Sequence, residues 1–338
     1  MIARSGAVLL CAALLASCAA PPPRPPEPPL FWPPPPAPPR IAFIETISRP
    51  ADAGIERGFF RRVVDLVFGA RDERLVRPMA VVSEQGVLFV ADPGARGVHR
   101  FDRKAGDYAL IRRAKDEPLP SPVGLARGTA GEVYVSDSEL RAIFVIRPGA
   151  KVATPVALAA ALAQPTGLAY DAAHGRLFVA DTAAHCVRVF DRDGNLVATI
   201  GRRGTDSGEF NFPTLLWRTP QGWLYVTDSM NFRVQMFDEG GRFVGKFGGA
   251  GDGTGDLPRE KGVATDRYGH IYIVDALFHA VQIFDESGQL LLSLGGLGHG
   301  RGEFWLPTGI FIGEDDRVYV ADSYNRRVQV FRYLGGDT

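Results

Sequence analysis

The sequence predicts an all-β fold built from six copies of one unit, and two regularities lead to this prediction. An aspartate preceded by an aromatic residue and a valine or isoleucine recurs six times, at intervals of 45, 44, 47, 47 and 47 residues. An apolar residue stands nine positions after every one of these aspartates, which indicates a second buried strand at a fixed offset. The repeated aspartates are Asp92, Asp137, Asp181, Asp228, Asp275 and Asp322. The apolar residues are Phe101, Ile146, Phe190, Phe237, Phe284 and Phe331.

Each unit contains four short strand patterns, which are clearest in the third copy. Strands are expected at residues 166–170, 176–180, 187–190 and 196–200. Turn sequences separate them, with Asp-Ala-Ala-His-Gly before the second strand and Asp-Arg-Asp-Gly-Asn before the fourth. No segment inside the repeats has the length and periodicity of an amphipathic helix. Four strands in a unit of about 46 residues predict a β-propeller, in which antiparallel blades stand around a central channel.

The two ends of the repeat region predict how the ring closes. The last copy stops soon after its third strand, at residues 328–332, and lacks a fourth strand. Ile41–Ile47 precedes the first copy and has the pattern of a fourth strand. Pairing these two segments leaves no free sheet edge, which a closed ring requires. We therefore expect a six-bladed propeller over residues 41–338, closed by the N-terminal strand.

Two segments carry a family resemblance. VTDSMNFRVQMF ends at Phe237 and VADSYNRRVQVF ends at Phe331, and each has an asparagine three and an arginine five residues after its aspartate. Pro-Thr-Gly opens the inner strands at Pro165 and Pro307. These sequences resemble the NHL repeat, and the resemblance covers residues 77–333. It implies the propeller fold and says little about chemistry, because propellers host many functions.

Only the fourth and sixth copies keep both motif residues, as Asn231 with Arg233 and Asn325 with Arg327. The fifth copy has Ala280 where the arginine stands. We expect the motif aspartate and arginine to pair locally in a structural role.

The N-terminal segment resembles an export signal. Residues 6–16 are an apolar run that is too short for a membrane span of about 20 residues. The sequence Leu-Ala-Ser-Cys that ends at Cys18 resembles the lipobox of bacterial lipoproteins. The resemblance implies a signal peptide over residues 1–17, cleavage before Cys18 and lipidation of that cysteine, which anchors the chain to the envelope membrane. An ordinary signal peptide with an incidental cysteine is the alternative.

Residues 18–40 are expected to form a tether behind the lipidated cysteine. Thirteen prolines lie between Pro21 and Pro39, and polyproline II rises about 3.1 Å per residue, so this spacer reaches about 60 Å. A ligand for an aromatic groove of a partner is the alternative. Ala19 follows the cysteine where inner-membrane retention often has Asp, and this resemblance favours the outer membrane. The propeller then faces the periplasm or the cell surface.

Composition excludes several classes of protein. The chain has 38 basic and 38 acidic residues, so it carries no electrostatic footprint for nucleic acid. Its three cysteines are too few for a disulfide framework or a four-cysteine zinc site. We expect a monomer that binds no nucleic acid and contacts the membrane only through its lipid anchor.

The residue after each inner-strand proline is expected to line the channel. NHL-fold amidating lyases place histidine zinc ligands at such positions, and this chain has no histidine there. We therefore expect no catalytic residue, no metal and no cofactor. The six channel positions are Met79, Val123, Thr166, Thr214, Lys261 and Thr308.

Other polar and glycine-rich signals have structural interpretations. His185 and His279 lie four residues after motif aspartates, but no third histidine shares their register, so we expect polar loop residues. The glycine-rich stretches 201–210, 248–256 and 295–304 are expected to be interblade turns, because no helix follows as a phosphate loop requires. Cys186 is expected to be buried and unreactive.

Apolar and aromatic residues occupy the turns after the second strands of blades four to six. With a neighbouring arginine they have the composition of a binding hot spot. The alternative is that they fold over the blade tops and cover neighbouring strands. The candidate partner-binding residues are Met230, Phe232, Leu277, Phe278, Tyr324 and Arg326.

Residues 54–69 contain the helix-like stretch of the mature chain, with apolar residues at helical spacing over 54–68. It either packs on the propeller or is offered to a partner or to the headgroup layer.

The functional expectation is a non-enzymatic, membrane-tethered binding or scaffold propeller of the bacterial cell envelope. It would recognise a protein or an envelope polymer through loops on one face. The alternative is an envelope hydrolase or lyase of propeller type with a metal in the central channel.

Overall fold

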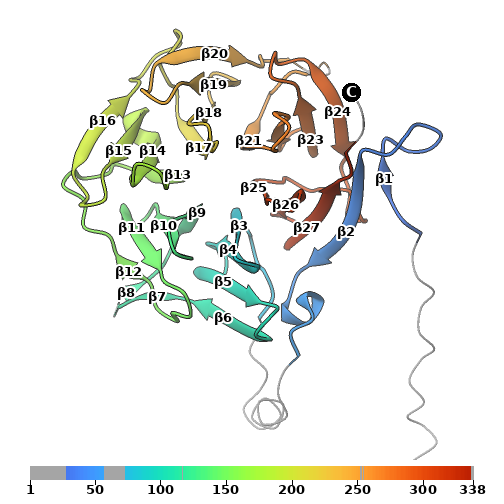
Figure 1. Ribbon diagram of the computed structural model, residues 1–338, viewed down its shortest axis with the longest axis horizontal. Coiled ribbons are helices and arrows are strands. Elements are labelled where there is room, and N and C mark those ends of the chain that lie inside the picture. The colour runs from blue at the N-terminus through green and yellow to red at the C-terminus, as the bar shows by residue number, and fades with distance from the viewer. Residues whose placement is uncertain (1–27, 57–72, 116, 252, 254, 336–338) are drawn as a thin grey trace, which may run out of the picture.

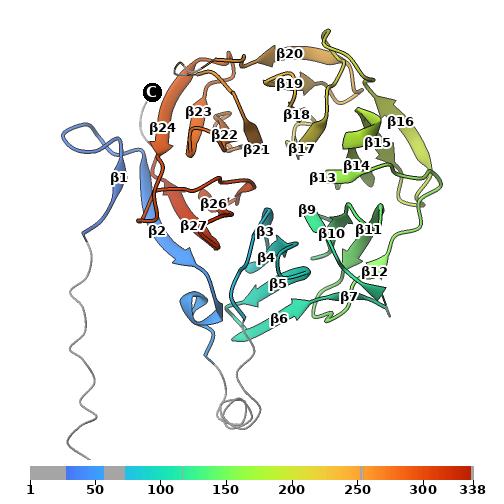
Figure 2. The same cartoon turned by 180° about the vertical axis from the view of Figure 1, so that it is seen from behind.

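Six antiparallel sheets stand around a central axis and follow one another along the chain (Figure 1). The structure, a computed structural model, describes residues 28–56, 73–115, 117–251, 253 and 255–335. The view from behind shows the same ring, with β2 beside β27 where the two ends of the propeller meet (Figure 2). The fold is therefore the all-β, six-bladed propeller that the repeat spacing predicts.

Four-stranded blades follow one another, with the innermost strand first in blades 1 to 5. Blade 1 consists of β3 (Ala80–Glu84), β4 (Val87–Asp92), β5 (Gly97–Asp102) and β6 (Asp107–Ile111). Blade 2 consists of β9 (Pro122–Arg127), β10 (Val133–Asp137), β11 (Ala142–Ile146) and β12 (Thr154–Pro155). Blade 3 consists of β13 (Pro165–Asp171), β14 (Arg176–Asp181), β15 (Cys186–Phe190) and β16 (Leu196–Ile200).

The second half of the ring repeats this arrangement. Blade 4 consists of β17 (Pro213–Arg218), β18 (Leu224–Asp228), β19 (Arg233–Phe237) and β20 (Phe243–Phe247). Blade 5 consists of β21 (Glu260–Thr265), β22 (Ile271–Asp275), β23 (Ala280–Phe284) and β24 (Leu290–Gly295). Blade 6 consists of β25 (Ile310–Ile312), β26 (Arg317–Asp322), β27 (Arg327–Tyr333) and β2 (Ile41–Ile47). The small elements are the hairpin β7 (Arg113–Ala114) and β8 (Glu117–Pro118), and the 3-10 turns η1 (Pro50–Ala53) and η2 (Thr182–Ala184).

Strand β2 closes the ring with the boundaries that the sequence predicts. It pairs antiparallel with β27, from Ile41 opposite Tyr333 to Ile47 opposite Val328. Phe43 meets Phe331 with ring centroids 5.7 Å apart. The prediction is confirmed, because the outer edge of β27 is covered by the strand from the other end of the chain.

The last part of the expected spacer is not free chain, which corrects the sequence-based expectation. Strand β1 (Phe31–Trp32) pairs with β2 and adds a fifth strand to blade 6. The Trp32 ring packs 5.6 Å from the Phe331 ring, and Arg301 donates a hydrogen bond to the carbonyl of Pro28. Leu30, Phe31 and Trp32 interrupt the prolines, and their apolar surface is enough to dock this stretch on the blade.

The hydrophobic core lies within and between the blades. All six apolar residues at the nine-residue offset are buried, each exposing at most 1% of its surface. All six motif aspartates are fully buried at the ends of the second strands. The repeated register in the sequence thus marks the core of every blade.

Two glycines near the start of innermost strands, Gly309 of a Pro-Thr-Gly motif and Gly262 of the Glu-Lys-Gly sequence in blade 5, allow these strands to approach their neighbours. A Cβ at Gly309 would lie 2.5 Å from the carbonyl oxygen of Met79 in blade 1. A Cβ at Gly262 would lie 2.8 Å from the carbonyl oxygen of Thr308 in blade 6. Only glycine fits where neighbouring backbones pass this closely.

Some predictions fall outside the described residues. These are the signal peptide, Cys18, the first part of the tether and nearly all of the helix expected over residues 54–69. Within the described residues, no helix combines the length and hydropathy needed to cross a membrane.

Candidate functional site

The propeller has two distinct faces, which follow from the antiparallel order of its strands. The aspartate face carries the turns after the second strands, each starting at a motif aspartate, together with the interblade turns. The cavity face carries the turns between the first and second strands and the turns between the third and fourth. The sequence-based candidates for partner binding all lie on the aspartate face.

The motif aspartates bind backbone N–H groups of the segment that leads into their own blade. Asp322 accepts a hydrogen bond from the backbone N–H of Trp305 at 2.8 Å. Asp228 accepts one from the backbone N–H of Asn211 at 2.6 Å. Each buried carboxylate thus fixes the path of the chain between two blades.

The motif arginines extend this arrangement to the glycine-rich turns. Arg327 Nε donates to Asp322 at 2.6 Å, and its two amino groups donate to the carbonyls of His299, Gly300 and Glu303 at 2.7 to 2.8 Å. Arg233 binds Asp228 and the turn before blade 4 in the same way. The expected local pairing is present, and the glycine-rich stretches are interblade turns.

The two histidines in alternate blades tie neighbouring blades together. His185 Nδ1 accepts a hydrogen bond from the backbone N–H of Phe212 at 3.2 Å. His279 Nδ1 accepts one from the backbone N–H of Leu306 at 3.0 Å. Phe212 and Leu306 precede inner-strand prolines and have positive φ angles of 56° and 46°. Both histidines therefore act as neutral acceptors that hold strained residues in place.

The expected channel positions stand at the aspartate-face end of the innermost strands. Thr166 donates to the carbonyl of Thr214 at 2.8 Å, from blade 3 to blade 4. Thr308 donates to the carbonyl of Pro78 at 3.2 Å, from blade 6 to blade 1. Burial lowers the pKa of Lys261 and the neighbouring Arg259 lowers it further. The hydroxyls of Thr166 and Thr308 thus connect adjacent blades, whereas the Thr214 hydroxyl pairs with Thr227 and Ser229 in its own blade.

Three of the six candidate partner-binding residues share one register on successive blades. Met230, Leu277 and Tyr324 each stand two residues after a motif aspartate and are 54%, 52% and 50% exposed. Arg326 is exposed, whereas Phe232 and Phe278 are half-buried. The structure thus separates three exposed tips from two phenylalanines that partly cover the blades.

A residue missed by the sequence reasoning joins this group. Trp305 lies on the interblade turn before blade 6, is 39% exposed and packs 5.6 Å from the ring of Tyr324. The sequence contained a signal for this residue. The turns before blades 4 and 6 both contain Gly-Glu-Phe, and the next residue is the polar Asn211 in the first turn but the large aromatic Trp305 in the second.

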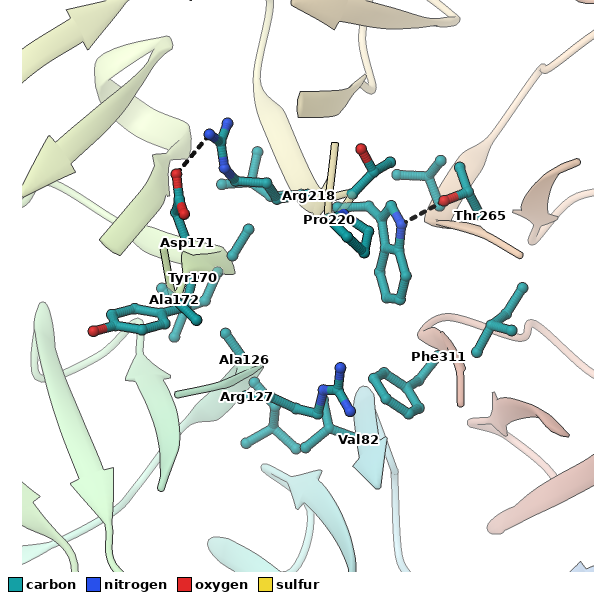
Figure 3. A pocket seen from close by; sticks show the side chains of 18 of the residues that line it. Val82, Ala126, Arg127, Tyr170, Asp171, Ala172, Arg218, Pro220, Thr265 and Phe311 are labelled. Carbon is teal, nitrogen blue, oxygen red and sulfur yellow. Dashed lines mark hydrogen bonds and ion pairs between the residues drawn. The ribbon is translucent and has the colours of Figure 1, made fainter. Parts of the chain in front are cut away.

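The cavity face holds a cavity of about 760 Å³ at the mouth of the channel (Figure 3). Arg127 and Phe311 project toward its middle, while Arg218 and Asp171 meet at its wall. Trp217 also lines it, with its indole ring 5.9 Å from the Phe311 ring at 66°. Trp217 Nε1 donates to Thr265 Oγ1 at 2.8 Å, which fixes the indole across two blades.

Ion pairs surround this cavity. Arg218 and Asp171 are 2.6 Å apart, with side chains only 4% and 7% exposed. Burial raises the pKa of Asp171, but hydrogen bonds from His174 and Arg218 outweigh it and hold the pKa below its usual range. Arg127 lies 3.7 Å from Glu84 and 3.4 Å from Glu314. Burial raises the pKa of Glu84; Arg127 lowers it and Glu314 raises it.

The sequence reasoning missed this cavity because it considered the wrong end of the inner strands. The informative position is four residues after the inner-strand proline, or after Glu260 in blade 5. It is small in four blades, with Val82, Ala126, Ala169 and Ala264, and aromatic in the other two, with Trp217 and Phe311. Two aromatic side chains at a repeat position that is otherwise occupied by small side chains indicate a special site, and this pattern is visible in the sequence.

Blade 5 departs from the others at its first inner-strand residue. Glu260 replaces the proline and is fully buried, and no described residue forms a hydrogen bond with either of its carboxylate oxygens. Burial raises the pKa of Glu260 to about 9, and Asp275 and Asp228 contribute in the same direction. Glu260 is therefore a neutral carboxylic acid at neutral pH.

Other reactive groups are few in the described chain. Cys186 is a buried free thiol, and burial raises its pKa, as expected for an unreactive cysteine. Among the described residues, no group of three or more His, Cys, Asp or Glu side chains is arranged to hold a metal ion.

Comparisons with known proteins agree with this architecture. The family model of the NHL repeat matches residues 162–190 and 304–331. No curated protein sequence matches the chain.

Several solved structures share the fold. A protein of unknown function from Bacteroides thetaiotaomicron has a TM-score of 0.60 at 14% identity, covering 78% of this chain and 70% of its own. An auxiliary nutrient binding protein from the same organism has a TM-score of 0.59 at 12% identity, covering 78% and 71%. A virginiamycin B lyase from Staphylococcus aureus has a TM-score of 0.55 at 13% identity, covering 77% and 96%. At these identities the likeness concerns the fold alone, so the chain is a six-bladed β-propeller in which the NHL repeat is detected at residues 162–190 and 304–331.

Proposed function

We propose that this chain is a non-enzymatic binding propeller, tethered to a membrane of the bacterial cell envelope, that recognises a partner protein. The observation that carries the proposal is the row of half-exposed apolar tips at one register on three successive blades. Met230, Leu277 and Tyr324 expose 54%, 52% and 50% of their surface. We call these three residues, with Trp305 and Arg326, the partner surface.

The chemistry of the partner surface favours a protein. Tyrosine, tryptophan, methionine and arginine are the residue types enriched in protein interfaces and their hot spots. Tyr324 and Trp305 pack against each other at 5.6 Å and present two rings side by side. Met230 and Leu277 offer no hydrogen bonds to the hydroxyl groups of a sugar polymer, whereas they suit an apolar patch of a protein.

The partner surface stands on a rigid support. The turn that carries Tyr324 is fixed by Asp322 and Asn325, which hydrogen-bond at 2.9 Å, and by the Arg327 contacts. Loops that are already ordered lose little conformational entropy on binding, so more of the contact energy appears as affinity. The other candidates, Phe232 and Phe278, are half-buried on the same turns.

The N-terminal segment and the comparisons support the proposed membrane tethering and the binding role. The signal peptide, Cys18 and the proline-rich segment resemble an exported lipoprotein, and strand β1 joins that segment to blade 6. One structural neighbour is described as an auxiliary nutrient binding protein, and another as a lyase. A C18A variant is expected to move from the membrane fraction to the soluble fraction, and retention in the membrane would contradict lipid anchoring.

Site-specific photocrosslinking in intact cells tests the partner surface. A photoreactive phenylalanine analogue replaces Leu277, and the matched control replaces Val244, which is 48% exposed on an outer strand. We expect one discrete protein adduct from position 277 and none from position 244. Equal labelling from both positions, or attachment of position 277 to a polysaccharide alone, would contradict the proposal.

Metal analysis separates the proposal from its alternative. The alternative is a hydrolase or lyase with a metal in the central channel. Purified protein is expected to contain no stoichiometric Zn²⁺ or Ca²⁺, and one equivalent of either ion would favour the enzyme.

A further inference from the structure

We propose that the cavity on the cavity face binds a small organic cation, an ammonium group carried by a compact apolar body. This site lies on the opposite face from the partner surface and does not depend on it. The proposal rests on the lining of this cavity, in which carboxylates outnumber arginines and two aromatic rings, those of Trp217 and Phe311, lie side by side.

The lining carries a net negative charge. It contains three arginines and six carboxylates, so the formal balance is 3 − 6 = −3 with His174 neutral. Carboxylates in a recess with apolar walls focus their field on the enclosed space. The carboxylates are Glu84, Asp171, Glu239, Asp266, Glu314 and Asp316.

Two of the three arginines are already matched by carboxylates at short distances. Arg218 lies 2.6 Å from Asp171, and Arg267 lies 2.6 Å from Asp316. An anionic ligand that bound Arg218 or Arg267 would have to displace the carboxylate from that arginine. A cationic ligand displaces neither pair, and this asymmetry favours a cation.

The third arginine marks where the cation binds. The Arg127 guanidinium lies 5.4 Å from the centroid of the Phe311 ring, with Glu84 and Glu314 at 3.7 and 3.4 Å. An aromatic face with two carboxylates is the arrangement that stabilises an ammonium group. Arg127 is 38% exposed and holds its two partners only loosely, so it can swing aside when a ligand enters.

One arginine does not fully compensate the two glutamates. The Glu84 side chain is only 13% exposed. Burial raises its pKa, Arg127 lowers it, and Glu314 raises it again. A second cation beside Glu84 therefore stabilises the ionised carboxylate.

The remaining walls suit a compact apolar body. Trp217 is held by its bond to Thr265 and presents its ring beside Phe311. Val82 and Ala126 are small and leave the volume open (Figure 3). A cavity of about 760 Å³ is within the range of small-molecule sites.

Calorimetric titration of the full chain with three probes of one shape tests the proposal. The probes are benzylammonium, benzyl alcohol and benzoate, which differ in charge at the same position. We expect benzylammonium to bind at least about tenfold more tightly than benzyl alcohol, and benzoate to bind more weakly than both. E84Q is expected to weaken benzylammonium binding about tenfold, and R127Q to strengthen it, because Arg127 no longer competes for the glutamates.

A matched control and a folding check accompany these variants. E139Q removes an exposed carboxylate from the aspartate face and is expected to leave benzylammonium affinity unchanged. Near-ultraviolet circular dichroism verifies that every variant is folded. Preferential binding of benzoate that R127Q abolishes would assign an anion site and overturn the proposal. So would the absence of benzylammonium binding to both wild type and R127Q at millimolar concentration, or an equal loss in E84Q and E139Q.

Discussion

On the aspartate face, Arg233 and Arg327 each bind an aspartate and three backbone carbonyls, whereas on the cavity face Arg127 contacts two glutamate side chains at 3.4 and 3.7 Å. Guanidinium groups that bind backbone carbonyls fix the course of the chain. A guanidinium that contacts only side chains, as Arg127 does, can exchange them for a ligand without changing the course of the chain.

This difference indicates that charged side chains stabilise loops on the aspartate face and surround a cavity on the other face. The charged groups of the aspartate face hold the loops, and the proposed partner recognition there uses apolar tips such as Met230 and Leu277. The charged groups of the cavity face surround an open space, and the proposed ligand recognition there is electrostatic. The following predictions test this division, beginning with the largest expected effect.

Loss of a motif arginine should destabilise the fold most. R327M removes the positive charge that pairs with the buried carboxylate of Asp322, together with one donor to each of three backbone carbonyls, and we expect a loss of about 4 kcal/mol in the free energy of unfolding. Chemical denaturation measures it. R202M is the control, because Arg202 is 83% exposed beside Glu209 and should change stability by less than about 0.5 kcal/mol. Equal effects of the two variants would show that the motif arginine is not structural.

The buried acid of blade 5 should make stability depend on pH. The pKa of Glu260 is about 9 in the folded chain and 4.5 as its reference value, so the folded state binds more protons between these pH values. Stability is therefore highest below about pH 4.5 for this group and declines up to about pH 9. The slope is at most about 1.4 kcal/mol per pH unit.

E260Q removes this titration while keeping the shape of the side chain. We expect E260Q to be about 3 kcal/mol more stable than wild type at pH 8 and to differ little at pH 5. Denaturation at both pH values measures this difference. A gain of the same size at both pH values would mean that ionisation of Glu260 is not its cause.

The threonine that links the last blade to the first should have a smaller effect. T308V removes the hydroxyl that donates to the carbonyl of Pro78, and we expect a loss of about 1 kcal/mol. T199V, at an exposed position of strand β16, is the control and should be neutral. Thermal unfolding of both variants measures the difference. An unchanged stability of T308V would mean that the bond from Thr308 to Pro78 does not stabilise the closed ring.

The smallest effect on stability is expected at the partner surface. L277A and Y324A truncate half-exposed tips and should each change the free energy of unfolding by less than about 1 kcal/mol. A larger loss would mean that these tips cover the neighbouring strands, the alternative interpretation of their sequence.

Much of the ring could be predicted because its signals are local and repeated. The closing strand β2, the six buried aspartates and the six buried apolar residues all follow from register. Alternation and turn chemistry act over a few residues, so one sequence contains them.

The cavity and strand β1 could not be predicted in the same way. Trp217 and Phe311 are 94 residues apart, and only ring closure brings their side chains to 5.9 Å. Strand β1 lies among prolines, which argue against a strand, and it forms because the Trp32 ring packs against the ring of Phe331. Tertiary contact overrides the local signal in both cases.

The division between the faces is tested most directly by partner capture in two variants measured side by side. Both carry the photocrosslinker at position 277; one also carries M230A and Y324A, and the other carries E84Q. We expect the first to lose the protein adduct and the second to retain it at the wild-type level. Loss of the adduct in E84Q with retention in the M230A and Y324A variant would contradict the account and move partner recognition to the cavity face.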